Sequence, residues 1–105
     1  MKKKSLKSFR LPTDGPSGEY QTLYNNYNSW TAMTDPSGPQ FVLGGRTEPG
    51  SSPLYQGTLG FYWSSSAHTN ATFAYILYLI GTNSTVVPAR DDYKLFGFSL
   101  RCLAQ

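Results

Sequence analysis

The sequence contains few of the residues that disulfide scaffolds, metal sites and most catalytic centres require. Its 105 residues include one cysteine, one histidine and only 14% charged residues. Because Cys102 has no second cysteine to pair with, an internal disulfide is excluded and the fold must be held by packing. The apolar neighbours Leu100 and Leu103 predict that the Cys102 thiol is buried like a small hydrophobic group.

Long hydrophobic runs are also missing. The longest, residues 73–80, has eight residues, whereas a helix that crosses a membrane needs about 20. The lysine-rich start, residues 1–10, is not followed by the apolar segment of a signal peptide. We therefore expect no membrane insertion and no export signal in this chain. Two settings fit: a domain excised from a larger secreted or surface protein, or part of a particle, such as a phage, that assembles without export.

The formal net charge of +3 arises at the N-terminus. Residues 1–10 hold five of the nine basic residues, while residues 11–105 hold four basic and six acidic ones, a net charge of −2. A basic start of this kind is typical of an added solubilising tail, so residues 1–8 are expected to form a disordered arm before one domain at 9–105. Nucleic acid is not a favoured partner.

Motifs of catalysis and cofactor binding are missing as well. The glycines form neither a phosphate-binding loop nor a dinucleotide fingerprint. Ser64, His68 and Asp91 have the side chains of a hydrolase triad, but no nucleophile elbow accompanies them, and His68 is interpreted as an ordinary polar contact in a loop. We expect no enzymatic activity and no cofactor.

Aromatic residues and turn formers are abundant instead. Eight Tyr, six Phe, two Trp, ten Gly and seven Pro indicate a folded domain rich in strands and turns. Apolar positions repeat with helical spacing at 19–27, which predicts one helix with Ser17 as its N-cap and a tyrosine-rich stripe facing the core. Residues 28–59 are predicted to form a long irregular loop. Strands are predicted at 6–11, 60–64, 73–80 and 96–103, with a short one at 86–87 and a turn at Pro88.

The run at 73–80 is apolar at both strand parities. One parity consists of Tyr75, Leu77 and Leu79, and the other of Ile76, Tyr78 and Ile80. We expect the first set to face the core and the second set to face outward. An exposed apolar row is typical of a binding surface. The alternative is a central strand that is buried on both faces beneath a helix or loop.

The order of these features resembles a known family. A strand is followed by Leu11-Pro12-Thr13, a helix, a long glycine-rich loop, Phe61-Tyr62-Trp63-Ser64-Ser65, a strand, and Gly97-Phe98-Ser99-Leu100-Arg101-Cys102. With Ala74-Tyr75-x-Leu77-x-Leu79 between the last two segments, the chain resembles the Fibrobacter succinogenes major paralogous domain family from Phe9 onward. That family is similar to a bacterial branch of the C-type lectin fold.

The resemblance implies an α+β domain with a C-type lectin-like fold: small antiparallel sheets, one or two helices and long ordered loops. It also implies that the first and last strands pair, that the helix packs on the sheet, and that residues 64–96 form the ligand face. Domains of this type serve as variable proteins of diversity-generating retroelements, which rewrite adenines in the coding template.

The composition of the implied ligand face favours such rewriting. An Asn codon that is randomised at its adenines never encodes Glu, Lys, Gln, Met or Trp. Residues 67–96 contain one of these, Lys94, whereas the other 75 positions contain fourteen. Strands and turns also avoid Glu, Lys and Gln, so the depletion has a second interpretation.

The resemblance does not extend to the known chemistry of the fold. Calcium-dependent sugar sites of C-type lectins use a Glu-Pro-Asn or Gln-Pro-Asp loop and a Trp-Asn-Asp strand, where this chain has Glu48-Pro49-Gly50 and Trp63-Ser64-Ser65. Because the amide and carboxylate oxygens are missing, we expect no calcium site of that kind. The enzyme-like relatives use paired cysteines, and this chain has only Cys102.

These observations predict a non-enzymatic ligand-binding domain with a variable recognition surface at about residues 64–96, in an adhesin tip or a phage receptor-binding protein. It would act at a cell surface, outside the cell or on a phage particle, as part of a larger assembly, and would bind an unknown protein or glycan. The alternative is a structural domain of a bacterial cell-surface protein with no external ligand. The predicted contact residues are His68, Asn70, Phe73, Ile76, Tyr78, Ile80, Asn83, Arg90, Asp91, Asp92, Tyr93, Leu95 and Phe96.

Overall fold

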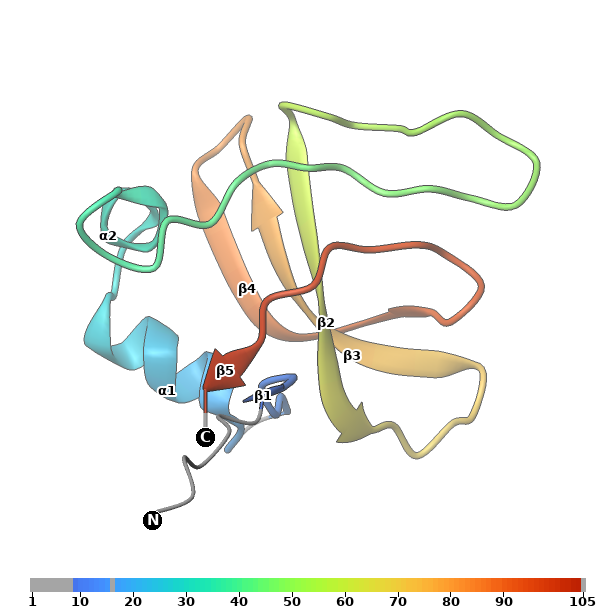
Figure 1. The fold of residues 1–105 in the computed structure, drawn as a ribbon, viewed down its shortest axis with the longest axis horizontal. Coiled ribbons are helices and arrows are strands. Elements are labelled where there is room, and N and C mark those ends of the chain that lie inside the picture. The colour runs from blue at the N-terminus through green and yellow to red at the C-terminus, as the bar shows by residue number, and fades with distance from the viewer. Residues whose placement is uncertain (1–8, 16, 105) are drawn as a thin grey trace, which may run out of the picture.

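The computed structural model describes residues 9–15 and 17–104, which have α+β architecture (Figure 1). In chain order, the elements are β1 (Phe9–Arg10), α1 (Glu19–Asn26), α2 (Trp30–Thr34), β2 (Leu59–Ala67), β3 (Phe73–Ile80), β4 (Thr85–Tyr93) and β5 (Leu103–Ala104). Neither helix of this part of the chain has the length and apolar character needed to cross a membrane. The predicted basic arm, residues 1–8, lies outside the described residues.

The strands form two antiparallel sheets. β2, β3 and β4 make a three-stranded sheet with β3 in the centre, and β1 pairs with β5. The pairing of the first and last strands, which the resemblance implied, is confirmed. The predicted strand at 73–80 is confirmed with its bounds. The predicted continuous strand at 96–103 is wrong, because Gly97 and Ser99 make only single bridges before β5 begins.

The start of α1 is stabilised by the segment that precedes it. Its N-cap is Gly18 and not the predicted Ser17, and no side chain caps it from that position. Instead the amide of Glu19 donates to Oγ1 of Thr13 at 2.9 Å. The Glu19 carboxylate accepts hydrogen bonds from the Arg10 guanidinium and from the amide of Thr13, and these lower the pKa of Glu19 to about 2.

The main core lies between the helices and one face of the three-stranded sheet. Tyr20 of α1 is fully buried, and its hydroxyl donates to the carbonyl of Trp63 at 2.9 Å. Burial raises the pKa of Tyr20 well above its usual range, so its hydroxyl stays protonated. The buried members of this core are Tyr20, Met33, Phe41, Tyr62, Leu77, Leu79 and Val86.

The second helix, α2, lies inside the segment that was predicted to be an irregular loop. Ser29 is its N-cap, and Oγ of Ser29 accepts the amide hydrogen of Ala32 at 3.0 Å. Met33, one turn into the helix, is fully buried. The capping serine was a usable signal, but a helix of five residues is too short to show an apolar period.

The central strand β3 is buried on both faces. Leu77 and Leu79 face the main core, as predicted. Ile76 was predicted to face outward, and this is wrong, because its side chain is fully buried on the opposite face. That second face is covered by Phe98, whose ring stacks on Phe61 at 5.3 Å between centroids. The alternative of a strand covered on both sides is therefore correct for this part of β3.

Both edge strands carry bulges. Between the pairs Trp63–Ile76 and Ala67–Ala74, three residues of β2 lie opposite Tyr75 alone. These are the serines 64–66, and Oγ of the first donates to the carbonyl of Tyr75 at 2.6 Å. The Ser64 hydroxyl therefore replaces part of the interrupted backbone ladder.

The bulge of β4 explains a second difference from the sequence-based expectation. Pro88 was predicted to form a turn, but the strand continues through it from Thr85 to Tyr93. Pro88 and Ala89 both lie opposite Leu77, and Ala89 has a φ of 59°. Proline lacks an amide hydrogen and is tolerated at such a bulge on an edge strand.

Asp14 joins the segment before α1 to this bulge. Its side chain is buried, with 7% of the residue exposed. Its Oδ1 accepts the amide hydrogens of Gly15 at 2.8 Å and Ala89 at 2.7 Å, while its Oδ2 has no hydrogen-bond partner among the described residues. Burial outweighs the two hydrogen bonds and raises the pKa of Asp14 to about 6.

This carboxyl group makes stability depend on pH. The pKa of Asp14 is about 6 in the folded chain and 3.8 ordinarily, so the folded state holds the proton more tightly. The stability that this adds is complete below about pH 4 and is lost as the pH rises through about 6. We expect the free energy of unfolding to fall by up to about 3 kcal/mol across this window.

Urea unfolding of the wild type and of Asp14→Asn from about pH 4 to about pH 7 measures this loss. Asparagine keeps an acceptor at Oδ1 but does not ionise, so the variant should show no such decrease. Comparing the two proteins cancels the contribution of Glu19, which has the opposite sign and lies at lower pH. Parallel pH profiles for the two proteins would contradict the assignment to Asp14.

Candidate functional site

Three connecting segments gather at one end of the molecule. In Figure 1 the loop at 44–58, the turn at 68–72 and the segment 94–99 all extend to the right, away from α1 and α2. Thr47 and Gly97 join two of them, since the amide of each donates to the carbonyl of the other at 2.9 and 2.8 Å. The long loop is thus held to its neighbours, and the three segments border one surface.

Four predicted contact residues meet at this end of the sheet. They are His68, Phe73, Asp91 and Tyr93, and with Tyr75 we call them the loop-end cluster. The register places Phe73 opposite Tyr93 and Tyr75 opposite Asp91. The ring centroids of Phe73 and Tyr93 lie 4.9 Å apart, and the His68 ring lies 4.8 Å from Tyr75 and 5.7 Å from Phe73.

Hydrogen bonds fix the tautomer and the orientation of the His68 ring. Nδ1 of His68 accepts the amide hydrogen of Asn70 at 2.9 Å, so in the neutral ring the hydrogen is on Nε2. Nε2 lies 3.3 Å from Oδ2 of Asp91 and can donate to it. Asn70 in turn accepts the amide hydrogen of Thr72 through Oδ1 at 3.0 Å. These contacts fix the turn at 68–72 and orient the Asp91 carboxylate.

The loop-end cluster offers both apolar area and polar groups to solvent. Tyr93 is 47% exposed, and Asp91 is also exposed. Leu95, another predicted contact residue, is 76% exposed and follows Tyr93 along the chain. Phe96 packs its ring against that of Tyr93 in an edge-on arrangement at 5.6 Å. Aromatic rings with hydroxyl and carboxylate groups beside them are well suited to binding a partner surface.

The other predicted contact residues do not belong to this cluster. Ile76 is buried and faces no ligand. Tyr78 and Arg90 lie together on the opposite sheet face, where the guanidinium is 4.9 Å from the ring centroid. Ile80 and Asn83 lie at the other end of β3, at its hairpin with β4.

Asp92 also has a structural partner, Arg46, which sequence reasoning did not single out. The guanidinium of Arg46 lies 3.4 Å from the Asp92 carboxylate and 2.6 Å from that of Glu48. It also lies 4.4 Å from the ring centroid of Phe96 and 5.1 Å from that of Phe61. The side chains of Arg46 and Asp92 are only 19% and 12% exposed. We call Arg46, Glu48 and Asp92 the loop anchor, because they attach the loop at 44–58 to the sheet.

The cysteine does not lie where the sequence predicts. Cys102 is exposed, so the expectation of a buried thiol is wrong. Its neighbour Leu100 is 63% exposed, so the apolar sequence around the thiol does not mark a core position. Within residues 9–15 and 17–104, no group of three His, Cys, Asp or Glu residues is placed to hold a metal ion.

Comparison with known proteins identified no relative. No family model, no curated protein and no solved structure matches the chain. The geometry of the residues is therefore the basis on which function is proposed.

Proposed function

We propose that the chain is a recognition domain with a C-type lectin-like fold and that the loop-end cluster binds a partner at a bacterial or phage surface. One observation carries the proposal: His68 and Phe73, from the turn before β3 and from its first residue, meet Asp91 and Tyr93 of β4 at an open end of the sheet. The α+β architecture and the paired first and last strands are compatible with that fold. As a variable protein of a retroelement, the domain would change its contact residues and keep its scaffold.

Pre-organisation supports this function. The rings of His68, Phe73 and Tyr93 pack on one another in the free protein, and the loop anchor attaches the longest loop to the sheet. Few side chains therefore need to be ordered on binding, which leaves more of the contact energy as affinity. Exposed aromatic residues are the side chains that most often dominate binding energy at interfaces.

Alanine replacement tests the location of the site. We expect Tyr93→Ala and Asp91→Ala each to weaken binding by about tenfold or more, because both side chains are exposed at the centre of the proposed surface. Multimerised domains on arrays of immobilised glycans and bacterial surface proteins provide the measurement. Asn83→Ala, at the far end of the sheet, is the control and should bind like the wild type. A ligand that is bound equally by all four proteins would place the site elsewhere.

Natural variation tests the proposed diversification separately. The encoding locus should be sequenced in many genomes of the source population and replacements scored from residue 64 to residue 101. We expect replacements to concentrate at exposed positions such as Asn70, Asp91, Tyr93 and Leu95, while the buried Ile76 stays fixed. Scattered or silent changes would contradict diversification and favour a domain of fixed specificity or a structural domain.

A further inference from the structure

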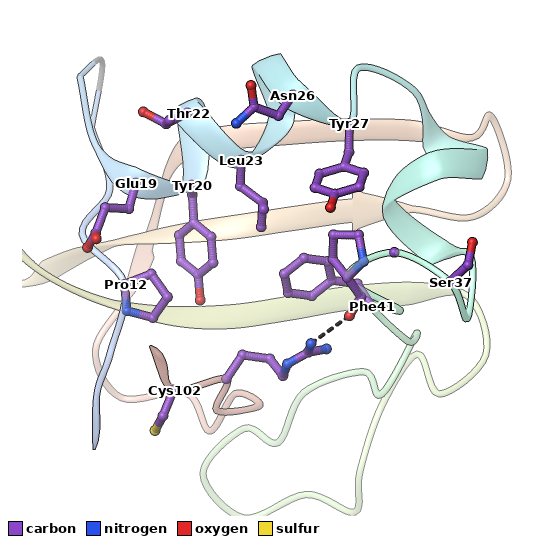
Figure 2. Close-up of a pocket in the computed structure, with 13 residues that line it drawn as sticks. Pro12, Glu19, Tyr20, Thr22, Leu23, Asn26, Tyr27, Ser37, Phe41 and Cys102 are labelled. Carbon is purple, nitrogen blue, oxygen red and sulfur yellow. Dashed lines mark hydrogen bonds between the residues drawn. The ribbon is translucent and has the colours of Figure 1, made fainter. Parts of the chain in front are cut away.

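A pocket lies on the helix side of the molecule, between α1, the loop at 37–41 and the segment before β5 (Figure 2). Its volume is about 480 Å³, and small-molecule sites are typically about 300–1,000 Å³. We call it the α1 pocket. Six of its thirteen lining residues carry a ring or an apolar side chain: Pro12, Tyr20, Leu23, Tyr27, Pro39 and Phe41.

Tyr20, Leu23 and Tyr27 belong to the helical stripe that the sequence assigned to the core. Tyr20 is fully buried, but Leu23 is only half-buried and Tyr27 is 39% exposed. In Figure 2 these three side chains extend from α1 toward the space above Phe41. Tyr20, at the start of the stripe, is therefore part of the core. Leu23 and Tyr27 instead form an apolar wall of the pocket that no element of the described residues covers.

The two charged side chains that border the α1 pocket differ in whether a group of opposite charge lies beside them. The Glu19 carboxylate pairs with Arg10 and also accepts the backbone amide of Thr13 at 3.0 Å, so its charge is neutralised at the pocket edge. Arg101, the other charged residue of the wall, has no carboxylate partner among the residues that the structure describes. Among the described residues, the pocket thus combines apolar side chains with one cation that has no carboxylate partner.

Arg101 is also held in position. Its guanidinium lies 4.8 Å from the ring centroid of Phe41 and donates two hydrogen bonds, to the carbonyls of Pro39 and Gln40. A guanidinium has five N–H groups, so N–H groups remain for an incoming acceptor. A planar fork that is stacked and already oriented loses little freedom when it binds a carboxylate.

We propose that the α1 pocket binds a small aryl carboxylate, with the ring among Leu23, Tyr27 and Phe41 and the carboxylate on Arg101. A planar ring matches a wall made of rings, and a guanidinium pairs with a carboxylate through two parallel hydrogen bonds. A phosphate dianion would require more than the single cation present, and an amine would meet Arg101 as a like charge. This site is separate from the loop-end cluster and does not depend on the function proposed for it.

Three ligands of one shape test the proposal on the full chain: 3-phenylpropionate, 3-phenylpropanol and 3-phenylpropylamine. We expect saturable binding of the carboxylate, about tenfold tighter than binding of the alcohol, and no detectable binding of the amine. Amide chemical shifts should change in α1, at 37–41 and at 101–102.

Arg101→Gln should reduce carboxylate affinity about tenfold, to that of the alcohol, and leave alcohol binding unchanged. Arg90→Gln is the matched control, since this arginine stacks on Tyr78 at a distance from the pocket and should bind like the wild type. Equal affinities for carboxylate and alcohol in the wild type would overturn the proposal even if Arg101→Gln fails to fold. Absence of saturable binding, or shift changes confined to the loop-end cluster, would also overturn it.

Discussion

Replacing Arg46 by alanine is expected to lower the free energy of unfolding by about 3–5 kcal/mol. The side chains of the loop anchor are mostly buried, and Asp92 is only 12% exposed in the wild type. Loss of the Arg46 guanidinium leaves the Asp92 carboxylate with the amide of Tyr93 at 2.8 Å but without a cation beside it. The rings of Phe61 and Phe96 also lose the guanidinium that packs on them. Urea unfolding at neutral pH, followed by tyrosine and tryptophan fluorescence, measures the loss.

Two further variants identify the cause of the stability loss in Arg46→Ala. The double variant Arg46→Ala with Asp92→Asn should recover about 1–2 kcal/mol relative to Arg46→Ala, because it removes the stranded charge. Arg90→Ala is the control: this exposed arginine contacts one ring, Tyr78, and its loss should cost less than about 1 kcal/mol. If Arg46→Ala costs no more than Arg90→Ala, the loop anchor does not hold the loop to the sheet.

Replacing Ile76 by alanine should lower the free energy of unfolding by about 3–4 kcal/mol. Its side chain is fully buried on the sheet face covered by Phe98, so truncation removes apolar contacts and leaves a cavity. Ile80 is the same residue type on the same strand but is only half-buried, and Ile80→Ala should cost less than half as much. Chemical unfolding of the two variants side by side decides between a buried and an exposed Ile76.

The result also separates two functional interpretations of β3. A stability loss below about 1 kcal/mol for Ile76→Ala, together with weaker ligand binding, would restore the idea of an exposed recognition row along the strand. A large loss of stability with no specific effect on binding would restrict recognition to the loop-end cluster. The two outcomes are distinguishable because stability and binding are measured on the same pair of variants.

Elements with a clear local period could be predicted from the sequence. Helix α1 follows the 3.6-residue pattern of its apolar positions, strand β3 follows a continuous apolar run of eight residues, and both occur where those features place them. Helix α2 was missed because five residues are too few to show a period. The bulges of β2 and β4 were missed because they depend on partners distant in sequence, such as Asp14, whose carboxylate accepts the amide hydrogen of Ala89.

Some residues of the candidate site could likewise be predicted from the sequence, and others could not. His68, Asp91 and Tyr93 were predicted as contact residues because they lie in the segment 64–96 that the family resemblance assigns to the ligand face. Ile76 was wrong because strand parity says which side a residue faces, but not whether that side is covered. Its cover comes from the segment around Phe98 and from the loop that Arg46 attaches. Arg46 itself looks like an ordinary loop residue in sequence.

The bulge at Pro88 and Ala89 has a consequence for how the chain can vary. Pro88 and Ala89 both lie opposite Leu77, whereas Val87 pairs with Tyr78 on one side of the bulge and Arg90 pairs with Ile76 on the other. Deleting one of the two bulge residues would leave Asp91 opposite Tyr75 and Tyr93 opposite Phe73, so both would keep the side of the sheet that they share with His68. The coding sequence can thus lose one codon at this point while the surface built on the sheet keeps its orientation.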